Sequence, residues 1–277
     1  GREMNTFRHL GEIPDRIQNV HLALGVFDGV HKGHQRVIGA VIGEAHRQGG
    51  KAAVYTFPNH PMAVIDPVNC PPLLTTAIQK EDLLSGLGVD LLVMEEFTEP
   101  LRFLEAEAFL ERLLGKLGIR SVAVGDDFRF GRGRRGDTAF LEKEGKDRGF
   151  RVLVAEEERF AGLPISSTFV RESVAHGEVH RVASVLGRPY EVSGLVVEGD
   201  GVGRRLGFPT ANVMSENEIW PKRGVYVVKA RTGSDLFPAV ANIGRAPTRR
   251  NLPENRLEVH LLEGGKNLYG QRLGVRF

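Results

Sequence analysis

The sequence is poor in cysteine and has no long apolar segment. Its single cysteine, Cys70, excludes a disulfide within the chain and a zinc site made of cysteine ligands. No run approaches the roughly 18 apolar residues of a membrane span, and residues 1–20 lack the apolar core of a signal peptide. We therefore expect a cytoplasmic protein without a membrane partner.

An excess of charge of either sign is also missing. The formal net charge is +2 over 277 residues, although 26% of them are charged, so the composition predicts no general affinity for nucleic acids. With 41% hydrophobic residues, the chain is long enough for two domains that each bury a core.

Residues 1–186 alternate between short apolar runs and helical patterns. The runs are rich in Val and Leu and predict buried strands at 21–27, 52–57, 90–95, 121–125 and 150–156. Apolar residues at helical spacing predict helices at 34–48 and 104–118. This alternation is typical of an α/β fold, in which right-handed crossovers connect the strands of a parallel sheet.

The pattern changes after Leu186. Further strand-like runs, separated by turns rich in Gly, Pro and Asn, lie at 190–200, 224–232, 236–244, 256–263 and 271–277. Short strands without long helices between them predict an antiparallel barrel or sandwich. We therefore divide the chain into two domains, residues 1–186 and 187–277, at the Leu-Gly-Arg-Pro sequence that ends a short helix.

The end of the first predicted strand is dense in glycine and histidine, in the sequence LGVFDGVHKGH at 24–34. Open parallel sheets bind ligands beyond the carboxyl ends of their strands, and Gly25 and Gly29 let the backbone pass close to one. His34 opens the predicted helix, whose N-terminal amides favour an anion. His31 and His34 are then expected to flank that anion.

Three interpretations compete for this turn. A capped helix with incidental histidines explains neither the two glycines nor the His-x-Gly-His pair, and a zinc site needs three or four ligands without any cysteine. A phosphate site explains both features, because histidines and helix amides stabilise charge on a phosphoryl group. The turn is neither a Walker A loop nor a GxGxxG fingerprint.

The run Gly25-x-Phe27-Asp28-Gly29-x-His31-x-Gly33-His34 resembles the signature of nucleotidylyltransferases, in particular that of bacterial FAD synthetases. Three further segments resemble elements of the same family: TFPNHP at 56–61, VGDDFRFGRGRRGD at 124–137 and ISSTFVRE at 165–172. The resemblance implies catalytic roles for His31, His34 and Arg171. It also implies ATP or phosphate contacts for Gly25, Phe27, Asp28, Gly29, His60, Asp127, Ser167 and Thr168.

Some features of these segments allow a second interpretation. The family more often has Glu-Pro where this chain has Pro58 and Asn59. The arginines at 129, 132, 134 and 135 fit a solvated loop as well as a loop that contacts phosphate. Ser166 or Ser167 fits a simple helix cap.

The second dense segment is GDGVGRRLGFPTANV at 199–213. Thr210 and Asn212 share one face if the chain is extended, and their oxygens suit magnesium bound together with phosphates. The segment resembles the riboflavin kinase signature, and NIGRAPT, LEVHLL and LYG resemble later elements of that family. The resemblance implies nucleotide contacts for Gly203 and Gly207, magnesium ligation by Thr210 and Asn212, and a catalytic base at Glu258, for which an ordinary cross-strand carboxylate is the alternative.

Together the two resemblances imply a bifunctional flavin enzyme. The riboflavin kinase-like barrel is expected to phosphorylate riboflavin to FMN, and the Rossmann-like nucleotidylyltransferase domain to transfer AMP from ATP to FMN with release of pyrophosphate. The expected partners are riboflavin, FMN, ATP and Mg²⁺, without nucleic acid and with a weak homo-oligomer at most. The alternatives are an FAD synthetase with an inactive or flavin-binding barrel, and a nucleotidylyltransferase with another phosphate acceptor.

In the resembling kinases, a C-terminal helix follows the barrel and covers part of the flavin site. The sequence given ends at Phe277, inside a strand-like run. We therefore expect a barrel without that helix and weak riboflavin phosphorylation.

Overall fold

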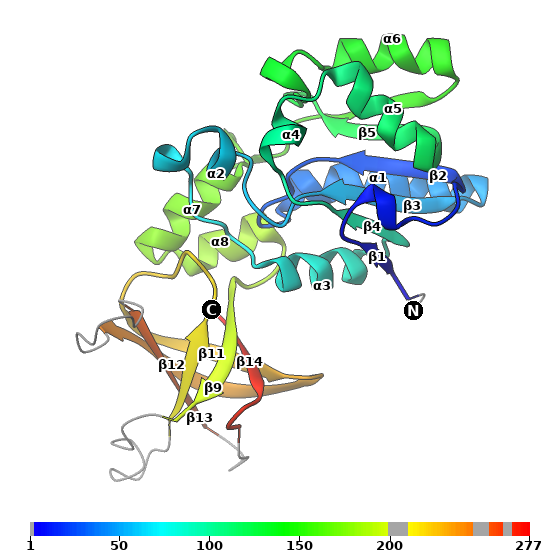
Figure 1. Cartoon of the computed structure of the whole chain (residues 1–277). Helices are drawn as coiled ribbons and strands as arrows, with labels where there is room; N and C mark the ends of the chain where they lie inside the picture. The colour runs from blue at the N-terminus through cyan, green and yellow to red at the C-terminus, as the bar shows by residue number, and fades with distance from the viewer. Residues whose placement is uncertain (1–2, 199–209, 246–254, 263–267) are drawn as a thin grey trace. The chain divides into compact units, whose positions relative to one another are not determined.

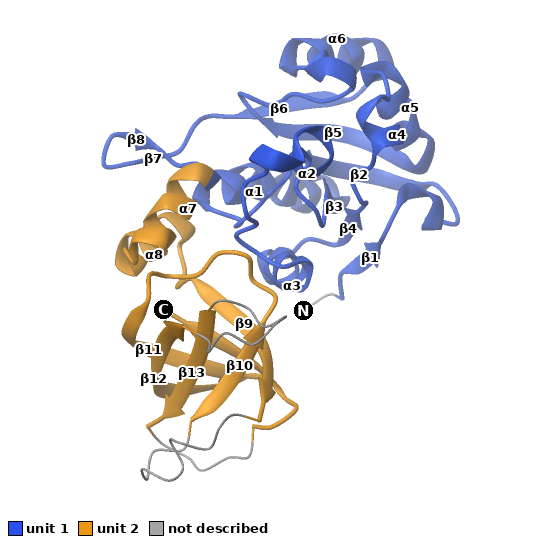
Figure 2. Ribbon diagram, turned by 60° about the vertical axis from the view of Figure 1, so that its left-hand side comes forward, with its two compact units in different colours: residues 1–167 blue, residues 168–277 orange. Residues whose placement is uncertain are grey.

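The computed structural model describes residues 3–198, 210–245, 255–262 and 268–277. The chain divides into two compact units, residues 1–167 and residues 168–277, shown in blue and orange in Figure 2. None of the helices in the described ranges combines the length and the hydropathy needed to cross a membrane.

The first unit is built on a six-stranded parallel sheet (Figure 1). Its strands are β1 (Asn5–Phe7), β2 (Ile17–Leu24), β3 (Lys51–Thr56), β4 (Leu91–Met94), β5 (Leu117–Gly125) and β6 (Arg151–Ala155). They lie in the order β1-β4-β3-β2-β5-β6, and all neighbours are parallel. The predicted α/β sheet is confirmed, with β1 as a short edge strand that the apolar pattern did not predict.

Helices connect these strands. The longer ones are α1 (Lys32–Gln48), α3 (Ala77–Leu87), α5 (Ala106–Lys116) and α6 (Thr138–Arg148). The shorter elements are α2 (Met62–Ile65), α4 (Glu99–Arg102), and the 3-10 helices η1 (Leu10–Glu12), η2 (Pro67–Asn69) and η3 (Arg132–Arg134). A small hairpin of β7 (Arg159–Phe160) and β8 (Leu163–Pro164) follows β6.

Apolar cores cover both faces of the sheet. Successive residues of a strand point to opposite faces: Leu22 packs in one core with Leu110 of α5, and Ala23 belongs to the other with Ile38 of α1 and Leu84 of α3. Because both faces are buried, the strands appear in the sequence as continuous apolar runs.

The second unit contains α7 (Ser167–His176), whose first residue belongs to the first unit, and α8 (Val179–Leu186). Six strands follow: β9 (Glu191–Val197), β10 (Ala211–Ser215), β11 (Gly224–Thr232), β12 (Asp235–Arg245), β13 (Asn255–Leu261) and β14 (Arg272–Arg276). They close into an antiparallel barrel in the order β10-β13-β12-β11-β14-β9. The predicted barrel is confirmed, and β10 is a further strand, which begins in the glycine-rich segment 199–213.

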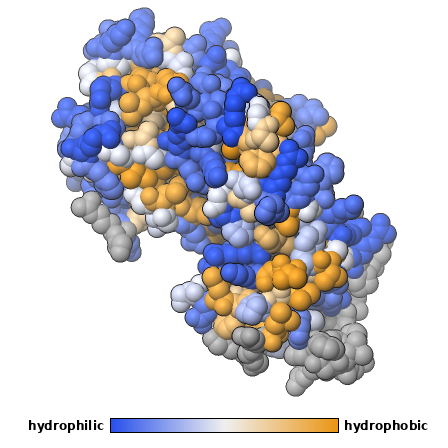
Figure 3. All heavy atoms as spheres, turned by 180° about the vertical axis from the view of Figure 1, so that it is seen from behind, coloured by the Kyte–Doolittle hydropathy of each residue, from blue (hydrophilic) through white to orange (hydrophobic). Residues whose placement is uncertain are grey.

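The barrel strands alternate between an apolar interior and an outer face. On β13, Leu257 and Val259 are fully buried, so Glu258 between them points away from the apolar core. Some outward positions are themselves apolar: Val225 and Val227 on β11 are 72% and 87% exposed. Figure 3 shows hydrophobic residues on the surface of the barrel part of one face.

Candidate functional site

The first unit holds a cavity of about 610 Å³ beyond the carboxyl ends of its strands. Gly25 follows β2, Phe57 follows β3, Asp126 follows β5 and Glu156 follows β6, and all four line it. This is where open parallel sheets bind ligands, and the volume lies within the roughly 300–1,000 Å³ of small-molecule sites.

Residues 25–31, which we call the phosphate turn, join β2 to α1 along one side of this cavity. The backbone is left-handed at Phe27 (φ 48°), Gly29 (φ 80°) and Val30 (φ 43°). Glycine adopts this conformation freely, but a β-branched valine does so only under strain, at a cost of order 1 kcal/mol or more. Such a turn persists because its surroundings enforce it, so the phosphate turn is preformed.

The two predicted catalytic histidines lie together in the cavity. His31 is the N-cap of α1, which therefore begins two residues earlier than predicted, and its Nδ1 accepts the backbone N–H of His34 at 3.4 Å. The imidazole rings stack with centroids 3.5 Å apart, and Phe27 meets His34 edge-on at 5.4 Å. With Nδ1 as acceptor, a neutral His31 carries its proton on Nε2, so this corner offers imidazole and helix N–H groups to an anion.

Asp28 and Gly29 belong to the phosphate turn but do not line the cavity. The Asp28 carboxylate is 1% exposed and accepts the backbone N–H groups of Leu74 (3.0 and 3.1 Å) and Thr75 (3.3 Å). The Gly29 N–H donates to the Thr75 hydroxyl at 3.3 Å. The structure therefore gives both residues a part in fixing the turn, while their assignment as ATP or phosphate contacts stays a prediction.

His60 and Ser167 do line the cavity. Nδ1 of His60 accepts the backbone N–H of Met62 at 3.1 Å, and the Ser167 hydroxyl donates to the carbonyl of Asp28 at 3.0 Å. Ser167 thereby ties the start of α7 to the phosphate turn. Thr168 and Arg171 follow on α7 but belong to the second unit, so their predicted contacts with phosphate remain a prediction.

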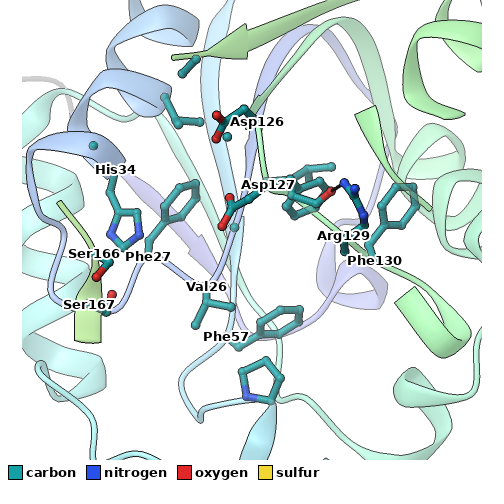
Figure 4. Close-up of a pocket in the computed structure, with 18 of the residues that line it drawn as sticks. Val26, Phe27, His34, Phe57, Asp126, Asp127, Arg129, Phe130, Ser166 and Ser167 are labelled. Carbon is teal, nitrogen blue, oxygen red and sulfur yellow. Dashed lines mark hydrogen bonds between the residues drawn. The ribbon is translucent and has the colours of Figure 1, made fainter. Parts of the chain in front are cut away.

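The loop after β5 supplies charged groups to the cavity. Asp127, Arg129 and Arg134 line it, whereas Arg132 forms an exposed ion pair with Glu105 at 3.3 Å. Figure 4 shows His34 beside Ser166 and Ser167 on one side of the cavity, Asp127 near the middle and Arg129 with Phe130 on the other side. All four arginines of the loop are exposed, and Arg129 and Arg134 also border the cavity, so a contact between this loop and phosphate stays a prediction.

An aromatic wall, made of Tyr55, Phe57, Phe97, Phe109 and Phe130, forms another part of the cavity lining. Its rings meet mostly edge-to-face, with centroids 5.3–5.7 Å apart. Sequence reasoning missed this wall, because its members come from β3, α5 and three separate loops. An apolar surface made of aromatic rings fits a further aromatic ring system.

Hydrogen bonds among Tyr55, Glu95 and Arg112 support the aromatic wall. The Tyr55 hydroxyl donates to Glu95 at 2.6 Å, and Arg112 pairs with the other carboxylate oxygen at 2.7 Å. Burial, with the Glu95 carboxylate beside it, raises the pKa of Tyr55 far above its ordinary value. Tyr55 is therefore a neutral hydrogen-bond donor that fixes its own ring in the wall.

The barrel gathers its predicted residues on the outer face of neighbouring strands. Asn212 on β10 lies opposite Glu258 on β13, which in turn lies opposite Asn242 on β12. Asn242 donates to Glu258 at 3.3 Å, and Nε of Arg256 contacts Glu258 at 3.2 Å and Asn212 at 2.9 Å. Sequence reasoning did not single out Arg256 or Asn242, because only strand pairing brings them to this face.

Three further residues of the barrel were predicted to bind magnesium or nucleotide, namely Thr210, Gly203 and Gly207. Thr210 directly precedes β10 and is half-buried, so it lies two residues before Asn212 at the entry to the strand. Gly203 and Gly207 lie outside the described residues. Their nucleotide contacts stay a prediction.

Comparisons with known proteins agree with this arrangement. Residues 13–169 match the family model of FAD synthetase, and residues 186–277 match that of riboflavin kinase. The bifunctional riboflavin kinase/FMN adenylyltransferase of Escherichia coli (strain K12) is 38% identical over 92% of this chain and 82% of its own. That of Haemophilus influenzae is 35% identical over 99% of this chain and 89% of its own.

A solved structure supports the fold of the whole chain. It is described as a macrolide-efflux protein from Streptococcus pneumoniae, is 26% identical, covers 99% of this chain and 89% of that chain, and superimposes with a TM-score of 0.86. The two family models follow one another along the chain. The relatives named above share more than 30% identity along almost its whole length, and both findings indicate the same family. The chain belongs to the family of bifunctional riboflavin kinase/FMN adenylyltransferases.

Proposed function

We propose that FMN is adenylylated to FAD in the cavity of the first unit and that riboflavin is phosphorylated to FMN on the outer face of the barrel. The first assignment is carried by the stacked pair of His31 and His34 at the N-terminus of α1, in the same cavity as the aromatic wall. An anion-binding corner beside an aromatic wall fits two phosphate-bearing substrates, one of which carries a flavin ring.

In the adenylylation step, a phosphate oxygen of FMN attacks the α-phosphorus of ATP. A phosphoanhydride bond forms, the bond from the α-phosphorus to the bridging oxygen breaks, and pyrophosphate leaves with that oxygen. Both reactants are anions, so the protein must neutralise and orient them. We assign the imidazoles and the amides of α1 to the ATP phosphates, the aromatic wall to the flavin, and Ser167, Thr168 and Arg171 to the leaving pyrophosphate.

Alanine at His31 or His34 tests this assignment. Loss of one preorganised donor from a phosphoryl site lowers kcat by about 100-fold or more, so FAD formation from FMN should fall by that factor. His46 on the exposed last turn of the same helix is the matched control, and His46→Ala should leave the rate unchanged. Normal FAD formation by His31→Ala/His34→Ala would refute the assignment.

On the barrel, we assign Glu258 as the base that takes the proton from the ribityl hydroxyl of riboflavin. That oxygen attacks the γ-phosphorus of ATP, and ADP leaves. Thr210 and Asn212 offer the hard oxygen donors that suit Mg²⁺ bound with phosphates, and the ion would neutralise phosphate charge. Because Arg256 donates to Asn212, metal binding there would displace this hydrogen bond.

Glu258→Gln tests the base without changing the size of the side chain. Riboflavin phosphorylation should collapse while binding of Mg²⁺-ATP persists, because the amide cannot take the proton. Glu216→Gln, at an exposed position of the same unit, is the control and should behave as the wild type. Equal loss of FAD formation from FMN in Glu258→Gln would show instead that Glu258 supports the fold.

We also propose the domain limits 1–186 and 187–277 for the two activities. They are supported by the end of α8 at Leu186, where Gly187 is left-handed, and by the match of residues 186–277 to the kinase family. The single cysteine, the partly buried Cys70, fits a reducing compartment such as the cytoplasm. Sedimentation of the purified chain, with and without nucleic acid, tests our expectation of a weak homo-oligomer at most and no nucleic-acid partner.

A further inference from the structure

Lys80, in the first half of α3, is a fully buried cation that the proposed chemistry does not use. Lysine is almost never fully buried unless it is paired. Here the ammonium donates to two backbone carbonyls, that of Val26 at 2.9 Å and that of Phe57 at 2.7 Å. These carbonyls belong to two different segments of the chain, so Lys80 bridges them.

The two segments border the cavity. Val26 lies in the phosphate turn after β2, and Phe57 opens the segment 57–61 after β3, which carries His60; the side chains of Val26 and Phe57 both line the cavity (Figure 4). The register of β2 and β3 ends at the pair Leu24–Tyr55. Beyond it, the Thr56 hydroxyl donates to Val26 at 2.8 Å and Lys80 spans the gap. Lys80 thus continues, by a side chain, the connection that the sheet no longer makes.

The same stretch of chain holds the phosphate turn at further points. Leu74 and Thr75, just before α3, bind the Asp28 carboxylate, and the Thr75 hydroxyl accepts the N–H of Gly29. The phosphate turn has left-handed residues that must be held in place. Residues 74–80 therefore act as a clamp on the turn, and within this clamp the contacts of Lys80 also reach the segment of His60.

We propose that Lys80 is a positioning residue for FMN adenylylation, which sets the separation between the phosphate turn and the segment 57–61 and thereby the distance at which the two substrates meet. The inference rests on the proposed function of the cavity. Lys80 does not line the cavity, so it acts through the two loops. A misplacement of reacting groups by about 1 Å can lower a rate about 100-fold. We therefore expect the loss of Lys80 to lower kcat rather than to raise KM.

The burial of its charge allows the effect of Lys80 on the reaction to be separated from its effect on folding. Burial lowers the pKa of Lys80 to about 8, partly opposed by the Asp28 carboxylate, so the charged form is held against a desolvation penalty. Methionine at this position removes that penalty together with the two hydrogen bonds. The Val26 carbonyl keeps the Thr56 hydroxyl as a donor and Asp28 keeps its backbone donors, so the relief of the penalty has to offset mainly the lost hydrogen bond to Phe57. The folded state should therefore tolerate Lys80→Met.

The test compares Lys80→Met with Lys143→Met, the same substitution at an exposed position of α6. For Lys80→Met we expect kcat of FAD formation to fall about 10- to 100-fold, KM for ATP and FMN to stay within about threefold, and the melting temperature to stay within about 5 °C. Lys143→Met should match the wild type. A kcat of Lys80→Met within twofold of wild type overturns the proposal, and so does a loss confined to KM.

A second variant keeps the proposal testable if Lys80→Met does not fold. Lys80→Arg retains the charge and the donors but is longer, so it should widen the gap and lower kcat; a folded Lys80→Arg with wild-type kcat overturns the proposal. His34→Ala, assayed in parallel, distinguishes a failure of the proposed function from a failure of the role proposed for Lys80. Intact FAD formation in His34→Ala refutes the proposed function, whereas its loss together with normal Lys80 variants refutes only the role of Lys80.

Discussion

Asp28→Ala should destabilise the first unit, because the carboxylate is the shared acceptor of the backbone N–H groups of Leu74 and Thr75. Removing it leaves two buried donors without that acceptor, at about 1–3 kcal/mol each. It also removes the carboxylate that favours the charged form of Lys80. We expect a loss of about 4 kcal/mol in the free energy of unfolding, which for a unit of this size corresponds to about 8–16 °C in melting temperature.

Circular dichroism melts of the full chain measure this effect. Asp28→Asn keeps one acceptor oxygen at the same place, so its melting temperature should fall by roughly half as much as that of Asp28→Ala. Asp147→Ala, on the exposed end of α6, is the surface control and should melt with the wild type. FAD formation is measured at 20 °C on the same samples.

The outcome separates the two roles considered for Asp28. If the carboxylate clamps the turn, stability and FAD formation fall together. If Asp28→Ala melts within about 2 °C of the wild type and nevertheless loses FAD formation, the carboxylate acts on a ligand, and the reasoning from its hydrogen bonds is wrong.

Tyr55→Phe removes a buried hydroxyl but keeps the ring in the aromatic wall, so melts should show a loss of about 1.5 kcal/mol with little change in the KM for FMN. Burial raises the pKa of Glu191, but hydrogen bonds from Arg231 and Arg276 outweigh it and leave the pKa below its ordinary value. Glu191→Gln should therefore be less stable than the wild type at pH 7, and urea unfolding should show the difference closing as the pH falls below 4.5. For Lys80 the pH dependence of stability has the opposite direction. Its pKa is about 8 in the folded protein, compared with 10.5 for an ordinary lysine. The cost of burying its charge is therefore complete below pH 8 and is relieved above it. The stability of the wild type relative to Lys80→Met should rise by about 3 kcal/mol between pH 7 and pH 10.5; a constant difference would contradict the pKa of Lys80.

The local pattern of the sequence was sufficient for most of the secondary structure. Apolar runs and helical spacing depend on neighbours within a few residues, and they located β2 to β6, α1 and α5 to within a few positions. The pattern did not predict β1, which has only three residues, or β10, which begins in the glycine-rich segment 199–213. It also did not predict the helices α3 and α6.

For the candidate site, the sequence by itself determined which polar residues stand at the end of which strand. In a parallel sheet the carboxyl ends of the strands meet at one edge, which predicted a ligand beside His31 and His34, whereas His60 and Asp127 were expected there from the resemblance. All four residues line one cavity. Only the tertiary structure decided where the other side chains point. Asp28, in the middle of the motif, turns towards the chain before α3, and the aromatic wall and the bridge by Lys80 join residues from separate elements. The physical reason is that the direction and burial of a side chain depend on packing between segments that are distant in the sequence. Such packing produces no periodic pattern in the sequence.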